Sequence, residues 1–215
     1  MNIKTLSMTI AAGSLFATGA MADYMGISCD ISFNVEGTWT SRIYANFSAE
    51  TDELDAVYGD SNHELTVSGS EGFFNATGTG ATAMDNNNAF WSIFPSMEWD
   101  SMVSIGMTHS ASGGTMSNIG IDFAAFNAGG NISTDNGAWY STPDQPNVLA
   151  VDGRVLIMQL TVADDDHAFG TVSIQGKDAD ASTNWTAAGV AFDTTVIPGP
   201  GAIALLGLAG FAARK

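Results

Sequence analysis

The stretch MGISCDISFNV, residues 25–35, alternates apolar and small or polar side chains from end to end. A period of two places one set of side chains on a buried face and the other in solvent, which is typical of a β-strand. Glu36-Gly37 indicates a turn, and the alternation resumes through Trp39, Ile43 and Phe47. The two stretches are therefore predicted to pair as a hairpin.

Further strand candidates are separated by stretches rich in Gly, Asn, Asp and Ser. They are residues 65–67, 72–75, 97–107, 119–126, 155–162, 171–174 and 185–195. The run VLIMQLTV at 155–162 is apolar on both parities, which predicts a strand buried on both faces. Residues 49–62, 78–88 and 129–146 are predicted to be irregular, with Leu54, Val57 and Tyr58 holding the first of these segments to the core.

The body of the chain shows no sustained period of 3.6 residues. Short strands between polar turns favour an all-β fold over alternating helices and strands. We therefore expect a single antiparallel β-sandwich, jelly-roll-like, over residues 23–195. A signal helix is expected before it and a short hydrophobic helix after it.

The first 22 residues have the parts of a secretory signal peptide. Lys4 is the one early cation, an apolar stretch runs from 8 to 21, and the small residues Ala20 and Ala22 precede Asp23. This arrangement predicts cleavage after Ala22. The predicted organisation is thus a signal peptide at 1–22, the sandwich at 23–195 and a tail at 196–215.

The tail reads VIPGPGAIALLGLAGFAARK. Pro198, Gly199 and Pro200 end the preceding structure, because proline fixes φ and constrains the residue before it. The run 201–213 carries no charge and is followed by Arg214 and Lys215. As a helix it would span about 20 Å, against a hydrocarbon core of roughly 30 Å. It is a marginal membrane segment, and the alternative is a buried C-terminal helix of the domain.

This order of parts resembles the PEP-CTERM sorting tails of bacterial exported proteins, with Pro-Gly-Pro in place of the usual Pro-Glu-Pro. The resemblance implies recognition and removal of the tail by an exosortase-like sorting enzyme after passage through the export machinery. It also implies transient membrane insertion through the C-terminal helix.

A second resemblance covers residues 99–176. It rests on WDS (99–101), IGIDF (119–123), GG (129–130), STDNGAW (133–139), TPD (142–144), GRVLI (153–157) and GTV (170–172). The segment is similar to a group of exported marine bacterial proteins, planctomycete ones in particular, that pair such a domain with a PEP-CTERM-type tail. The resemblance implies localisation and fold rather than a particular chemistry.

The exported portion is strongly acidic. The whole chain has a net charge of −17. The body contains all 23 acidic residues and only three cations, Arg42, Arg154 and Lys177, so its net charge is −20. Such a surface repels phosphate backbones, which excludes nucleic acid as a partner, and it disfavours anionic lipid. The acidity fits solubility in a saline exterior, and the alternative is binding of divalent cations.

Cys29 is the one cysteine, so the chain can form no internal disulfide. It lies in the alternating pattern of residues 25–35, where a free thiol behaves as a small apolar side chain. We expect Cys29 in the core.

The sequence contains neither Gly-x-Ser-x-Gly nor His-Glu-x-x-His. His63, His109 and His167 are isolated in predicted loops and are expected to be solvated. Glu98 and Asp100 lie two apart on a predicted strand, as a pair of glycosidase carboxylates could. The simpler interpretation places both on the solvent face, so we predict no catalytic residue and no enzymatic activity.

Two acidic loops are candidates for calcium, which prefers several oxygen ligands. One contains Asp164, Asp165 and Asp166, and the other contains Asp178 and Asp180. The alternative in each case is a solvated acidic hairpin, and no other cofactor is predicted.

Trp139 and Tyr140 lie in a polar stretch, where their rings could stack on a sugar, as could those of Trp91 or Trp185. The alternative is that these aromatic rings close the ends of the core. The expectation that covers all these features is an exported, surface-sorted, non-enzymatic structural component of the cell surface or extracellular matrix. The alternative is a β-sandwich module that binds extracellular polysaccharide, calcium or both.

Overall fold

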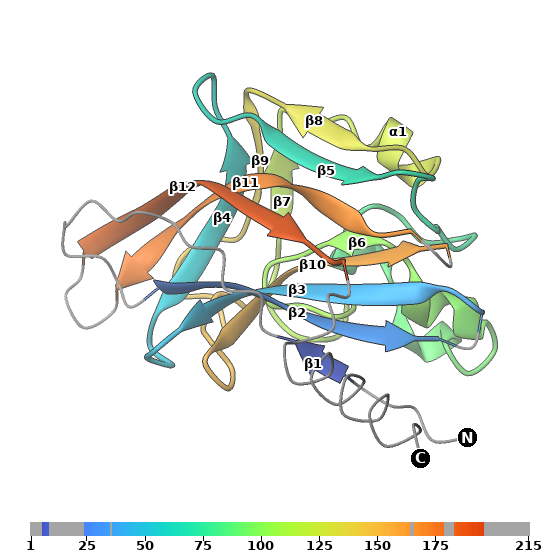
Figure 1. The fold of residues 1–215 in the computed structure, drawn as a ribbon. Coiled ribbons are helices and arrows are strands. Elements are labelled where there is room, and N and C mark those ends of the chain that lie inside the picture. The colour runs from blue at the N-terminus through green and yellow to red at the C-terminus, as the bar shows by residue number, and fades with distance from the viewer. Residues whose placement is uncertain (1–5, 9–23, 35, 164–165, 179–182, 196–215) are drawn as a thin grey trace, which may run out of the picture.

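The structure is a computed structural model that describes residues 6–8, 24–34, 36–163, 166–178 and 183–195. Two antiparallel sheets pack face to face as a sandwich (Figure 1). This confirms the predicted all-β class and the sandwich.

The first sheet has the order β1-β2-β3-β10-β6. Its strands are β1 (Leu6–Met8), β2 (Tyr24–Phe33), β3 (Trp39–Phe47), β10 (Arg154–Val162) and β6 (Met102–Val103). In Figure 1 it forms the lower layer.

The second sheet has the order β7-β9-β4-β11-β5-β8, with β12 paired to β11. Its strands are β7 (Ser117–Ile119), β9 (Gly137–Tyr140), β4 (Glu53–Gly59), β11 (Ala168–Asp178), β5 (Leu65–Gly69), β8 (Ile132–Thr134) and β12 (Thr183–Asp193). Short helices lie in the connections: η1 (Ala83–Asp85), η2 (Asn88–Phe90), η3 (Pro95–Trp99) and α1 (Ala124–Asn127).

The predicted hairpin is confirmed. Strands β2 and β3 pair from Tyr24↔Phe47 to Phe33↔Trp39, and Cys29 lies opposite Ile43. Both of these side chains are buried in the core between the sheets. Cys29 is therefore a core residue, as expected, and burial raises the pKa of its thiol to about 12.

Strand β10 is buried on both faces, as its composition predicts. Leu160 points into the core, whereas the Gln159 side chain meets the chain that follows η3. The Gln159 amide donates to the carbonyls of Glu98 (3.0 Å) and Asp100 (2.9 Å) and accepts from Arg42 Nε (2.8 Å). The second face of β10 is thus covered by a loop excursion rather than by another sheet.

Several predicted irregular segments are strands. Residues 49–62 contain β4, in which Leu54 and Val57 are fully buried. Residues 129–146 contain β8 and β9, each too short for a recognisable alternation. Tertiary burial of a few side chains outweighs the turn-forming composition of these stretches.

Conversely, three predicted strands are wrong over much of their length. The alternation at 97–107 is split between η3 and the two-residue β6, because Pro95 occupies the first turn of a 3₁₀ helix. Residues 72–75 form no strand, and Gly72 has φ of +90°. At 119–126, β7 ends at Ile119, and the Asp122 carboxylate accepts the Ala124 N–H at the start of α1.

Candidate functional site

A cleft of about 440 Å³ opens on the outer face of the second sheet. We call it the outer-face cleft and define it by its principal lining residues: Asp55 of β4, Tyr140 of β9, Gln175 of β11, and Asn184, Trp185 and Thr186 of β12. The consecutive strands β11 and β12 therefore meet β4 and β9, which lie far from them in the sequence, at one depression.

The register of the sheet explains why these side chains meet. Tyr140 pairs with Ala56, Ala56 pairs with Gln175, and Gln175 pairs with Thr186, so the four residues form one row across the sheet. The adjacent row along these strands contains Trp139, Val57 and Ile174, whose side chains are all fully buried. Since adjacent residues of a strand point to opposite faces, the row with Tyr140 faces outward.

Small residues keep the floor of the cleft low. Ala56 has only a methyl group between Tyr140 and Gln175. At Gly176 a Cβ atom would lie 1.8 Å from the Glu53 carbonyl oxygen and 2.8 Å from Cζ2 of Trp185. Position 176 has no room for a side chain, so the indole of Trp185 lies directly against the backbone there.

The acidic side of the cleft is Asp55. A register shift between Gln175 and Gly176 leaves Asp55 as the extra residue of β4. Its Oδ1 atom is buried and has no hydrogen-bond partner among the described residues. Burial, followed by the charge of Glu53, raises the pKa of Asp55 to about 6.

Trp185 lines the cleft from its inner side. Its ring stacks on Tyr24 with centroids 5.6 Å apart and meets Phe47 edge-on at 5.4 Å, so it is part of the core. Its Nε1–H is nevertheless buried and meets no acceptor in the described part of the chain. Because Thr186 faces outward, the neighbouring Trp185 side chain faces the core, and Asp55 is the lining residue that brings an unpaired acceptor to the cleft.

The two residues predicted to stack on a sugar, Trp139 and Tyr140, lie on opposite faces of β9. Tyr140 is half-buried and lines the outer-face cleft. Trp139 is fully buried on the opposite side of β9 and donates its Nε1–H to the Ser104 carbonyl at 3.0 Å. The prediction that Trp139 stacks on a glycan is therefore wrong, because no ligand can reach its ring.

The other aromatic candidates differ in accessibility. Trp185 is 4 % exposed, which leaves no open ring face. Trp91 is half-buried, meets the His109 ring edge-on and donates to Asn86 Oδ1 at 2.8 Å. Trp91 lies outside the outer-face cleft.

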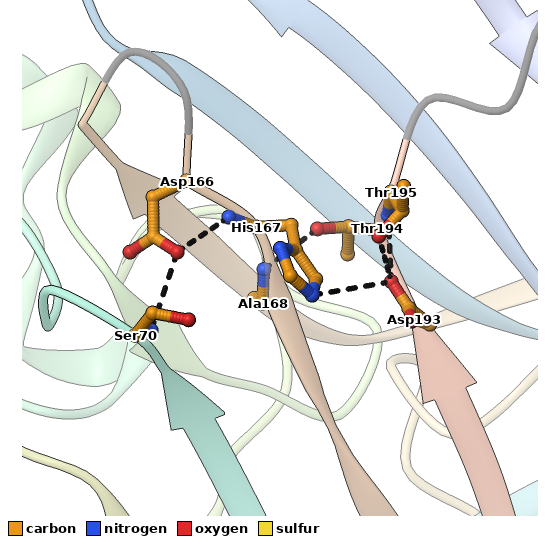
Figure 2. Close-up of polar contacts among 7 residues, drawn as sticks. All are labelled: Ser70, Asp166, His167, Ala168, Asp193, Thr194 and Thr195. Carbon is orange, nitrogen blue, oxygen red and sulfur yellow. Dashed lines mark hydrogen bonds and ion pairs between the residues drawn. The ribbon is translucent and has the colours of Figure 1, made fainter.

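Of the first predicted calcium loop, Asp164 and Asp165 lie outside the described residues, whereas Asp166 is placed. Figure 2 shows its carboxylate facing Ser70 and the backbone of His167. Asp166 Oδ1 accepts the N–H groups of Ser70 (3.2 Å) and His167 (2.7 Å), and Oδ2 accepts that of Glu71 (2.9 Å). Partial burial opposes ionisation, but these N–H groups outweigh it and lower the pKa of Asp166.

The second predicted calcium loop is only partly described. Asp178 ends β11, and Asp180 lies outside the described residues. Asp166 and Asp178 stand at opposite ends of that strand, too far apart to share one ion. Within the described ranges no three Asp, Glu, His or Cys side chains are close enough to hold a metal ion.

The hydrogen bonds of Asp166 lead to a stability prediction. Asp166→Ala is expected to lower the free energy of unfolding by about 1 kcal/mol, because it leaves three backbone N–H groups without their acceptor. Asp166→Asn keeps one acceptor oxygen and should lose less. Thermal unfolding with a chelator present measures both variants, and equal melting temperatures for Asp166→Ala and the wild type would contradict this role.

Glu98 and Asp100 do not share a strand face. Glu98 lies in η3, whereas Asp100 is fully buried after it and accepts the Ala76 N–H at 2.7 Å. The glycosidase pairing and the simpler solvent-face interpretation are therefore both wrong for Asp100. Burial raises the pKa of Asp100 to about 7, and its Oδ2 atom has no partner among the described residues.

The three histidines lie in loops, as predicted. His63 contacts Asp60 (3.6 Å), and His167 contacts Asp193 (3.9 Å), the second contact visible in Figure 2. Both pairs are substantially exposed, so they are surface contacts of small energetic value.

The predicted signal cleavage residues Ala20, Ala22 and Asp23 lie outside the described residues. The same holds for the sorting motif: Pro198, Gly199, Pro200, Arg214 and Lys215. Across the part of the chain that is described, no helix has the length and apolar character needed to cross a membrane.

Sequence reasoning missed Asp55, Gln175 and Asn184 as possible binding residues. Asp55 fell in a segment predicted to be irregular, and the partners of Gln175 in neighbouring strands depend on the register. Comparison with known protein families, with curated proteins and with solved structures finds no match for this chain.

Proposed function

We propose that this protein is exported and sorted to the cell surface, where its sandwich serves as a non-enzymatic structural component of the surface or extracellular matrix. Residues 6–8 form strand β1, paired with β2, in place of the helix that was expected there, so the proposal keeps a cleavable signal peptide at 1–22 without a helix at these residues. It also includes a short hydrophobic helix in the tail, after a jelly-roll-like sandwich. The export machinery and an exosortase-like enzyme are the partners that it requires.

The observation that carries the proposal is the pairing of a signal-like start with a sorting-like end around a strongly acidic body. All 23 acidic residues lie between these ends, and the only charged side chains in the ends are the cations Lys4, Arg214 and Lys215. This segregation fits a chain whose terminal segments contact membranes and whose body is kept in solution by like charge.

The described sandwich is consistent with a passive role. Two of its acidic side chains, Asp166 and Asp100, accept backbone N–H groups and so stabilise loops. Ser141 Oγ lies beside Asn147 Oδ1 at 3.4 Å rather than beside a histidine base. The second candidate function, binding of polysaccharide, is favoured by the outer-face cleft.

Surface display predicts that an extracellular protease digests the protein on intact cells. Joint replacement of Arg214 and Lys215 by alanine should reduce the accessible fraction severalfold, because the cationic stop after the apolar run is lost. The matched control exchanges the two residues, Arg214→Lys with Lys215→Arg, and keeps both charges. Full protection of the wild-type protein on intact cells would contradict the proposal.

A further inference from the structure

We propose that the outer-face cleft binds a neutral saccharide, with the Tyr140 ring against the sugar and the side chains of Asp55, Gln175 and Asn184 on its hydroxyl groups. This inference goes beyond the structural role proposed above and does not depend on it. A surface protein could carry such a site whether or not its tail is processed.

The first support is the unpaired hydrogen-bonding capacity among the lining residues. Asp55 is half-buried, and its Oδ1 atom is a buried acceptor that meets no partner in the described chain. A buried polar atom without a partner destabilises the fold, because it has lost its hydrogen bonds to water. A hydroxyl group of a polyol can donate to this oxygen, as a water molecule would in its absence.

The second support is the chemistry of the rim. Gln175 and Asn184 are exposed, and each amide offers both a donor and an acceptor. Tyr140 and Ala56 add an apolar surface beside them. A sugar ring likewise has apolar C–H faces and a polar edge, so this combination matches it better than it matches a purely apolar ligand.

The third support is charge, which selects the class of saccharide. Asp55 lines the cleft, and the charges of Glu53 and Asp144 lie near enough to raise its pKa further. Glu53 Oε2 accepts the Asp144 N–H at 3.3 Å. Lys177 is the nearby cation, and its Nζ already lies 3.6 Å from Asp144 Oδ1. Uronate or sulfate groups would be repelled here, and by the acidic body as a whole, so the ligand should be uncharged.

The size of the cleft agrees with a carbohydrate segment. A volume of about 440 Å³ lies within the range of small-molecule sites, which is about 300–1,000 Å³. The cleft crosses four strands from β9 to β12, and it can therefore hold a few sugar units lying across the sheet.

The test is affinity electrophoresis of the purified full chain through gels that contain either a neutral polysaccharide or an anionic one. Laminarin, mannan and xylan are the neutral probes, and alginate is the anionic probe. We expect retardation by at least one neutral polymer and none by alginate. Calcium and a chelator should give the same result, because none of the proposed contacts with the sugar involves a metal ion.

Three variants locate the site. Tyr140→Ala and Gln175→Ala should each weaken binding, Tyr140→Ala by about tenfold or more, as expected for loss of roughly 1.4 kcal/mol of contact energy. Phe90→Ala is the matched control, because Phe90 is an exposed aromatic residue of η2 outside the cleft. Far-UV circular dichroism checks that each variant is folded.

The outcomes separate clearly. No retardation by any neutral polymer overturns the proposal, and so does binding that Phe90→Ala abolishes while Tyr140→Ala and Gln175→Ala leave it unchanged. Binding to alginate alone, present with calcium and lost with chelator, would show a cation-bridged anionic ligand and would also overturn it. None of these results bears on whether the protein reaches the cell surface, so the structural proposal stands or falls separately.

Discussion

Replacement of Trp139 by alanine is expected to lower the free energy of unfolding by about 3–5 kcal/mol. The Trp139 side chain is fully buried on β9, beside Val57 of β4 in the core of the sandwich. Its removal leaves a large cavity and also deprives the Ser104 carbonyl of the indole N–H that it accepts at 3.0 Å. Domains of this size are typically stable by about 5–15 kcal/mol, so the variant should be close to unfolding.

Equilibrium denaturation followed by far-UV circular dichroism measures the effect. Trp139→Phe is the matched variant: it keeps an aromatic ring and loses the N–H group, so it should be intermediate. Tyr140→Ala, one residue away on the outer face, should have a much smaller effect on stability. A Trp139→Ala protein as stable as the wild type would place this ring at the surface and would revive a stacking role for it.

The stability of the wild-type protein is expected to fall as the pH rises from about 4 to about 7. Burial raises the pKa of Asp100 from 3.8 to about 7, so the folded state binds its proton more tightly than the unfolded state does. Stability falls with pH wherever the folded state holds more protons, here from the unfolded pKa up to the folded one. The loss from this group is about 4 kcal/mol at most.

Asp100→Asn isolates this contribution. The amide oxygen can still accept the Ala76 N–H that Asp100 Oδ1 accepts at 2.7 Å, but the side chain no longer has to ionise. The variant should have a flatter dependence on pH and should be more stable than the wild type at pH 8.

Other groups do not obscure the comparison. Asp55 contributes in the same direction up to about pH 6, and it is unchanged in the variant. Asp60 and Asp166 have lowered pKa values, so the stability they contribute is lost only at acid pH. Identical pH profiles for the wild type and Asp100→Asn, measured by thermal unfolding from pH 4 to 8, would show that Asp100 is not buried as described.

The sequence predicts the fold best where the alternation is long. The hairpin of residues 25–47 and the run at 155–162 both form as expected. In the hairpin many apolar side chains alternate in one register, and the run at 155–162 is apolar at almost every position. Strands β8 and β9 were missed because each is short. Strand β4 was missed because the extra residue Asp55 separates the buried Leu54 and Val57 by three positions and so breaks the alternation. Their burial depends on neighbours that no local pattern reveals.

The outer-face cleft could not be predicted for a related reason. It requires Tyr140, Ala56, Gln175 and Thr186 to share one row, and that row depends on the register of four strands. The sequence did single out the pair at 139–140, but the parity that buries one ring and exposes the other depends on which face of β9 meets the first sheet. Asp100 was misplaced similarly, since Pro95 turns an apparent strand into a 3₁₀ helix.

The most direct test of surface sorting is the mass and N-terminal sequence of the protein recovered from the outside of the cells that make it. The account predicts a chain that begins at Asp23 and has a mass reduced by the loss of residues 1–22, with a further loss at the tail. A full-length chain that begins at Met1 and is found only inside the cells would contradict it.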